Sequence, residues 1–165
     1  MRKDPLYFIA IVLPEDLQTE VTAFKHHIAQ TWGPRHALRS PPHITLQPPF
    51  AWPDQRLPAL RDCLRAFAVR QKRFYIHLKN FDVFPPRVVF VKPMPNADLE
   101  KLFSRLSAEL EAKLGWKDAR NERPFHAHVT IAHRDLEAGQ FPAVWQYFKG
   151  QTYERVFAAD NICLL

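Results

Sequence analysis

The stretch His43-Ile44-Thr45-Leu46 occurs a second time, in the same pattern, as His128-Val129-Thr130-Ile131. In each copy a histidine and a threonine alternate with aliphatic residues, which is typical of a short β-strand whose successive side chains point to opposite faces. The histidine and the threonine of each copy should therefore share one face, while the aliphatic residues turn towards a core. We expect each copy to supply half of one reactive site.

The surroundings of the two copies also repeat. The first copy follows a strand-like apolar run over 6–13, a proline and an amphipathic helix pattern over 15–32 that ends at a glycine. The second copy follows a strand-like run over 88–91, two prolines and a helix pattern over 96–114 that also ends at a glycine. This duplication predicts a pseudo-two-fold molecule, in which the two histidine and threonine faces meet across one cleft.

The remaining segments predict a second pair of strands and two further helices. We expect strands over 74–79 and 87–92 to be antiparallel neighbours, joined by a turn over 80–86. Further expectations are an edge strand over 35–40, a proline-rich loop over 47–53, a helix that begins at an Asp54 N-cap, a charged loop over 117–123, a short helix near 143–148 and a closing strand over 153–164. Together these elements predict an α+β fold, in which residues 1–165 form one domain of two lobes. Each lobe is a small antiparallel sheet backed by helices, and the active cleft lies between the lobes.

Composition and charge narrow the class of protein. The chain has 165 residues, 47% of them hydrophobic, which suits one compact domain with its own core. It has four glycines and contains neither GxGxxG nor GxxxxGK[ST], the motifs of glycine-rich phosphate-binding loops. The formal net charge of +6 favours a phosphorylated or polyanionic partner.

The cysteines and the first residues bear on location. Cys63 and Cys163 have no metal-ligand spacing and no disulfide-scaffold density, which favours a reduced protein. The apolar run over 6–13 is too short to span a bilayer. We therefore expect a cytoplasmic monomer without a membrane anchor.

The two motifs and their contexts carry a resemblance to a known family. The first is preceded by Ser40-Pro41-Pro42 and the second by Pro124-Phe125-His126-Ala127, and about half a domain separates them. In these features the chain resembles the two-histidine phosphoesterase superfamily, and within it the bacterial 2′-5′ RNA ligase-like proteins, better described as RNA 2′,3′-cyclic phosphodiesterases. The likeness covers nearly the whole chain. It implies metal-independent hydrolysis of nucleoside or RNA-terminal 2′,3′-cyclic phosphates to 2′-phosphates, with 2′-5′ RNA ligation as the reverse reaction and no cofactor.

The chemistry of the four motif residues fits this reaction class. Histidine, with an ordinary pKa of about 6.5, can act as base and acid near neutral pH, and each such role contributes roughly 10²- to 10⁴-fold. The resemblance assigns His43 as proton donor and His128 as proton acceptor. The hydroxyls of Thr45 and Thr130 can donate to the non-bridging phosphate oxygens. Two histidines of ordinary pKa would place the pH optimum of the reaction close to neutrality.

Other residues near the motifs have alternative interpretations. Arg134 has the parity of His128 and is a candidate phosphate ligand if the strand continues. Phe50 and Trp52 either stack on a base at the mouth of the site or pack against their own loop. His126 and His128 share a strand face and suggest a two-histidine metal site, but no Cys, Asp or Glu joins them at ligand spacing.

Three functions remain open from the sequence. The first is hydrolysis of 2′,3′-cyclic phosphates at RNA 3′ ends or in small nucleotides. The second is a phosphodiesterase of the same chemistry that acts on another small cyclic phosphate or on a 2′-5′ linkage. The third is a non-catalytic module that binds RNA ends and keeps the HxTx faces only to hold phosphate.

Overall fold

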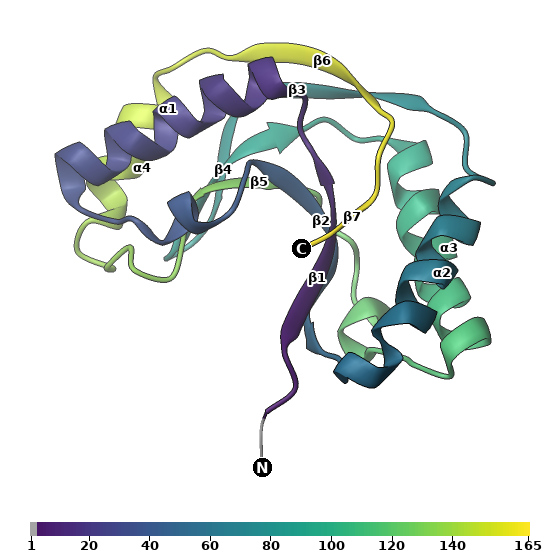
Figure 1. Ribbon diagram of the computed structural model, residues 1–165. Coiled ribbons are helices and arrows are strands. Elements are labelled where there is room, and N and C mark those ends of the chain that lie inside the picture. Colours follow the sequence, from purple (N-terminus) through teal and green to yellow (C-terminus); the bar gives the residue numbers. More distant parts are fainter. Residues whose placement is uncertain (1–2) are drawn as a thin grey trace.

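Two antiparallel sheets form the centre of the protein, as shown in a computed structural model whose described residues are 3–165 (Figure 1). The three-stranded sheet has the order β2 (His43–Ala51), β1 (Leu6–Val12), β7 (Cys163–Leu164). The four-stranded sheet has the order β5 (Val129–Ala132), β4 (Val88–Pro93), β3 (Phe74–Phe84), β6 (Glu154–Ala159). The fold is therefore α+β, as predicted, and each HxTx motif lies at an edge strand of its own sheet.

The helices cross over between the two halves. Helix α1 (Glu15–Trp32), which follows β1, packs against β5, and α4 (Phe141–Lys149) packs against β3. Helix α3 (Ala97–Leu114), which follows β4, packs against β2 and against α2 (Leu57–Ala68). In Figure 1, α1 and α4 accordingly lie on one side of the molecule and α2 and α3 on the other. Each motif strand is thus packed against the long helix of the opposite half.

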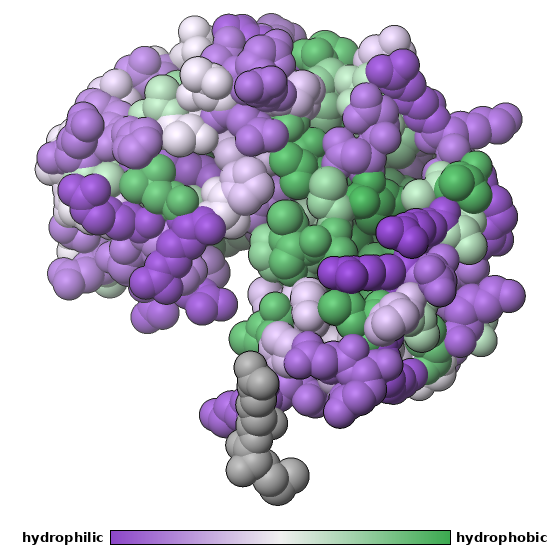
Figure 2. Space-filling model, viewed as in Figure 1, coloured by the Kyte–Doolittle hydropathy of each residue, from purple (hydrophilic) through white to green (hydrophobic). Residues whose placement is uncertain are grey.

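Strand β1 is central to its sheet, as its apolar sequence predicts. Ile9, Ala10 and Ile11 are fully buried, and β2 and β7 pair with the strand on its two edges. Full burial on both faces explains why the sequence shows a continuous apolar run where an exposed strand would alternate. Figure 2 shows hydrophobic residues over this middle part of the molecule, between two hydrophilic sides.

The two long helices begin and end where the sequence predicts. The Asn96 side chain caps α3 by accepting the N–H of Leu99 at 2.9 Å. Gly33 and Gly115, which follow α1 and α3, have φ angles of 101° and 62°, a region that glycine enters without steric cost. The buried face of α3 consists of leucines: Leu99, Leu102, Leu106 and Leu110.

Three local predictions were wrong around β2. Residues 36–39 form a 3₁₀ helix, η1 (His36–Arg39), and not an edge strand. Strand β2 runs through its prolines to Ala51, which pairs with Leu6, so the expected loop over 47–53 is mostly strand. An edge strand tolerates proline because one side of it needs no N–H donor. Asp54 caps no helix; it opens the 3₁₀ turn η2 (Asp54–Arg56), and α2 begins at Leu57.

Three further predictions failed in the second half. Strand β3 continues through the expected turn to Phe84, with a register shift where Asn80 has a φ of 59°. The segment expected to be a loop over 117–123 contains the 3₁₀ helix η3 (Ala119–Glu122), tied to β2 because Gln47 bonds to Asp118 and Asn121. The closing strand divides into β6 and β7, which belong to different sheets.

Among residues 3–165, none of the helices has the length and apolarity that crossing a bilayer requires.

Candidate active site

The two HxTx motifs meet at one cleft. His43 and Thr45 from β2 line a cavity of about 490 Å³ together with His128, immediately before β5, and Thr130 within β5. The aliphatic partners Ile44 and Val129 are fully buried on the opposite face, as the strand parity predicts. The other lining residues are Phe8, His36, Ala37, Arg39, Ser40, Pro48, Pro49, His133 and Arg134. The convergence predicted from period-two alternation is therefore present in the structure.

Both imidazoles are held by the same local hydrogen bond. His43 Nδ1 lies 2.6 Å from the Pro41 carbonyl, and His128 Nδ1 lies 2.7 Å from the His126 carbonyl, two residues upstream in each case. Because a carbonyl can only accept, Nδ1 must carry the proton in both rings. This tautomer leaves Nε2 of each neutral ring free to accept a proton from, or after protonation to donate one to, a bound group.

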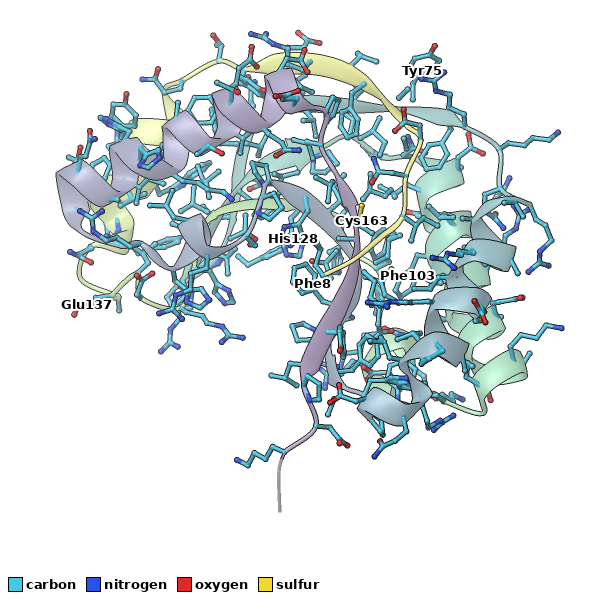
Figure 3. All side chains as sticks on the ribbon, in the orientation of Figure 1. Phe8, Tyr75, Phe103, His128, Glu137 and Cys163 are labelled. Carbon is cyan, nitrogen blue, oxygen red and sulfur yellow. The ribbon has the colours of Figure 1, made fainter. Side chains whose placement is uncertain are left out.

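Aromatic side chains hold the two rings from the side. Phe8 on β1 packs against His43 with ring centroids 5.0 Å apart. Phe84 and Phe90 pack against His128 at 5.1 and 5.6 Å. Figure 3 labels Phe8 and His128, which both line the cleft in the middle of the molecule. These contacts restrict ring rotation and exclude water from one side of each imidazole.

Burial also changes the protonation of the pair. Removal from water lowers the pKa of His43 and of His128 below the ordinary 6.5, because it penalises the charged imidazolium. The carbonyls of Pro41 and His126 partly oppose this by favouring the charged form. The positive charge of Lys25 lowers the pKa of His43 further, and His126 does the same to His128. Without a bound anion, both rings are therefore predominantly neutral at pH 7.

Lys25 is a residue of this site that the sequence analysis missed. It lies on α1 with 3% of its surface exposed, and its Nζ donates to the Ser40 carbonyl at 3.0 Å. Ser40 lines the cleft and precedes Pro41, whose carbonyl orients His43. The ammonium therefore lies directly behind the wall of the site. The signal was available, because Lys25 follows Val21 by four residues and precedes Ile28 by three, which puts it on the apolar face of α1.

The burial of Lys25 predicts an unusual pH dependence of stability. Burial lowers its pKa from 10.5 to about 8. Below pH 8 both native and unfolded chains hold the proton, and the native state carries the full cost of the buried charge. Between pH 8 and 10.5 the unfolded chain keeps the proton and the native chain releases it, so this group makes the native state more stable as pH rises, by about 3 kcal/mol in total.

Lys25→Met tests this account, because methionine keeps an unbranched side chain without the charge. We expect the free energy of unfolding of the wild type to rise relative to that of Lys25→Met between pH 8 and 10.5, measured by urea denaturation. Lys149→Met, at an exposed position of α4, should keep the wild-type pH slope. Parallel curves for wild type and Lys25→Met would contradict a buried, charged Lys25.

The other predicted residues divide into those inside and outside the cleft. Arg134 lines the cleft. Phe50 and Trp52 do not; they are 6% and 1% exposed and pack against Trp116, with ring centroids at 4.7 and 6.1 Å. Their rings have no face open to a base, so the structure agrees with the packing interpretation and not with base stacking. Strand β2 continues past its prolines to Ala51, so Phe50 lies within the strand and Trp52 directly follows it, instead of both lying on an open loop.

His126 faces away from the cleft of His43. It lines a separate hollow of about 260 Å³ with Phe84 and Phe90, while its carbonyl holds His128. Within residues 3–165, no group of three or more His, Cys, Asp or Glu side chains could hold a metal ion. His36, Arg39 and His133, which the sequence analysis did not single out, also line the cleft. They come from η1 and from the turn after β5, whose positions depend on long-range packing.

This arrangement of paired HxTx strands on two antiparallel sheets defines the class of two-histidine phosphoesterases. The chain matches the family model of the 2′-5′ RNA ligase superfamily over residues 13–165. It therefore belongs to that family.

Relatives and solved structures agree with this assignment. A Geobacillus sp. (strain WCH70) protein, named "Putative phosphoesterase", is 30% identical over 132 residues, which cover 79% of this chain and 72% of the relative. A phosphoesterase of the same description from Geobacillus kaustophilus is 28% identical over 161 residues, or 96% of this chain and 86% of the relative. Together with the family, these relatives support a phosphoesterase.

The fold is shared with solved structures of low sequence identity. The protein TT0787 of Thermus thermophilus superposes with a TM-score of 0.70 at 23% identity, over 97% of this chain and 87% of that one. E. coli LigT in complex with NADP+ gives a TM-score of 0.63 at 23% identity, over 99% of this chain and 87% of that one.

Proposed function

We propose that the cleft hydrolyses the 2′,3′-cyclic phosphate of a nucleotide or of an RNA 3′ end to a 2′-phosphate, without a metal ion. The observation that carries this proposal is the pair of imidazoles on one cavity, each with Nδ1 bonded to a carbonyl and Nε2 free. A base and an acid on either side of one phosphorus atom are what an in-line displacement needs.

The reaction assigns one proton transfer to each histidine. Neutral His128 Nε2 takes a proton from water, whose oxygen forms a bond to phosphorus. The bond from phosphorus to the ribose 3′ oxygen breaks, and protonated His43 gives its Nε2 proton to that oxygen. The products are a 2′-phosphomonoester and a 3′-hydroxyl, and the two histidines have exchanged protonation states. This assignment of His43 as donor follows the family resemblance, and the roles exchange in the reverse reaction, which closes the cyclic phosphate again and releases water. A 2′-5′ linkage would form when the 5′-hydroxyl of a second nucleotide attacks phosphorus in place of water and the 3′ oxygen leaves.

The threonines and the burial of the site support the same step. Thr45 and Thr130 both line the cleft, where their hydroxyls can donate to non-bridging phosphate oxygens. Hydrogen-bond donors in a half-buried site stabilise charge more than they would in water. A bound phosphate also raises the lowered pKa of the donor imidazole, so substrate binding itself protonates the acid.

The comparisons are consistent with a nucleotide ligand. Solved LigT structures hold NADP+ and 3′-AMP, and this chain shares their fold. The proposed partners are therefore RNA 3′ ends or small nucleotides with a 2′,3′-cyclic phosphate, and we propose a cytoplasmic monomer of one domain. Another small cyclic phosphate or a 2′-5′ linkage would use the same atoms.

A substrate panel with product mapping tests the proposal. The purified protein is incubated with the four nucleoside 2′,3′-cyclic phosphates, a 2′-5′-linked dinucleotide and 3′,5′-cyclic AMP, and products are identified by ³¹P NMR. We expect the 2′,3′-cyclic substrates to give 2′-phosphates and no 3′-phosphates. A 3′-phosphate product would reverse the assigned leaving group, and binding without turnover of any substrate would indicate a non-catalytic RNA-end module.

A further inference from the structure

One wall of the cleft carries two arginines and two histidines from two separate segments. η1 contributes His36 and Arg39, and the turn after β5 contributes His133 and Arg134. The lining of the cleft contains no Asp or Glu among the described residues 3–165. In Figure 3, nitrogen-tipped side chains gather beside the loop that carries Glu137, on this side of the molecule. The proposed mechanism gives the reacting phosphate two imidazoles and two hydroxyls, so the guanidinium groups of Arg39 and Arg134 are not needed for the proton transfers.

The two segments of this basic wall are fixed to each other. Asp135 Oδ2 accepts the backbone N–H of Arg35 at 2.6 Å and that of His36 at 2.9 Å. The carboxylate next to Arg134 is thus occupied by the start of η1. Arg134 itself has a φ of 43°, a left-handed conformation that is unusual for a residue with a side chain and is often found at functional sites. The bond through Asp135 holds the strained turn and η1 in one relative position.

The two guanidinium groups of this wall lack carboxylate partners. Within residues 3–165, neither Arg39 nor Arg134 has an acidic oxygen within 4.0 Å, and both line the cleft. Five arginines outside the cleft are each paired with an acidic side chain: Arg65, Arg70, Arg73, Arg120 and Arg155. A guanidinium presents a planar set of donors that matches a phosphate in a bidentate manner. Two guanidinium groups without acidic partners on one wall of the cleft therefore have donors available for an anion.

We infer that Arg39 and Arg134 bind a second phosphate of the substrate, on the 5′ side of the ribose that carries the cyclic phosphate. This inference rests on the proposed function and makes its substrate class specific. The preferred substrate is 5′-phosphorylated, and a nucleoside 2′,3′-cyclic phosphate with a free 5′-hydroxyl is a poor one. The second phosphate is either the 5′-monoester of a small nucleotide or the last internucleotide phosphate of an RNA.

The kinetic test compares three substrates that differ only on the 5′ side. These are adenosine 2′,3′-cyclic phosphate, its 5′-phosphate, and the dinucleotide ApA that ends in a 2′,3′-cyclic phosphate. For the wild type we expect kcat/KM at least tenfold higher for the second or third substrate than for the first. Preference for the second identifies a small nucleotide as the source, and preference for the third identifies an RNA end. Equal values for all three substrates contradict the inference while leaving the proposed function intact.

Two substitutions test whether Arg39 and Arg134 cause the preference for 5′-phosphorylated substrates. Arg39→Gln removes one guanidinium, and Arg134→Asn removes the other with a residue that tolerates the left-handed backbone. In the double variant, the ratio of kcat/KM between 5′-phosphorylated and unphosphorylated substrates should fall to about one. Arg65→Gln, on the exposed face of α2, should keep the wild-type ratio. If the variants lose activity on all three substrates equally, the arginines serve the reacting phosphate and the inference is wrong.

A binding measurement keeps the test independent of turnover. Adenosine 2′-phosphate and adenosine 2′,5′-bisphosphate are titrated into wild type and into the double variant by calorimetry. We expect the bisphosphate to bind the wild type at least tenfold more tightly than the monophosphate, and the double variant to bind the two within twofold. Equal Kd values in the wild type would overturn the second-phosphate site, even if no cyclic phosphate were hydrolysed.

Discussion

His43→Ala and His128→Ala should each lower kcat for 2′,3′-cyclic nucleotide hydrolysis by about 10²- to 10⁴-fold, because each removes one of the two proton transfers. Thr45→Val and Thr130→Val should lose less, since each removes one hydrogen bond to a phosphate oxygen and leaves both transfers in place. His26→Ala, at an exposed position of α1, is the matched control and should keep wild-type activity. A variant of either cleft histidine with near-normal kcat would remove that residue from acid and base catalysis.

A change of leaving group separates the two roles. Bis(p-nitrophenyl) phosphate releases p-nitrophenolate, which leaves without receiving a proton. If His43 is the donor, His43→Ala should lose far less activity on this ester than on the cyclic nucleotide. His128→Ala should lose most of its activity on both substrates. The opposite pattern would assign the acid role to His128. It would also agree with the position of Lys25, whose charge favours a neutral His43.

Local sequence patterns predicted the parts of the fold that depend on neighbouring residues. The continuous apolar run of β1 predicted a buried central strand, and Ile9 and Ile11 on one face and Ala10 on the other are fully buried. Period-two alternation predicted which side of each motif strand faces the cleft. The glycines after α1 and α3 predicted where those helices end, because only glycine enters their positive φ values easily.

Features set by distant contacts could not be predicted in this way. Strand β2 continues through Pro48 and Pro49 because β1 pairs with it as far as Ala51, and that pairing is invisible in the local composition. η1 is held by Asp135, about 100 residues away in the chain. The packing of each long helix against the motif strand of the opposite half likewise depends on tertiary contacts, which routinely override local preference.

The residues of the candidate site also divide into those predictable from local sequence and those that depend on distant contacts. The meeting of the four motif residues at one cleft could be predicted because their types and strand parity are local features of the sequence. For Phe50 and Trp52 the sequence left base stacking and packing open, and their burial, which favours packing, follows from the unexpected length of β2. Burial also could not be read from the motifs: two histidines of ordinary pKa predict an optimum near neutrality, whereas removal from water lowers the pKa of both, so we expect the optimum of the free enzyme at lower pH.

The dependence of kcat/KM on pH and on metal therefore tests the central claim, that two histidines catalyse the reaction without a metal ion. One imidazole must be neutral while the other is protonated, so the active fraction falls on both sides of an optimum. Because kcat/KM reports the free enzyme, and both free imidazoles have a lowered pKa, its maximum should lie below pH 6.5. The optimum of kcat should lie at higher pH, since bound phosphate stabilises an imidazolium.

The measurement is the hydrolysis of a 2′,3′-cyclic nucleotide across pH, on metal-stripped protein, with and without EDTA. The account predicts bell-shaped curves that stripping and EDTA leave unchanged, with the maximum of kcat/KM on the acid side of that of kcat. If stripping abolishes activity and Zn²⁺ or Mn²⁺ restores it, a metal site that includes His126 and His128 replaces the two-histidine mechanism.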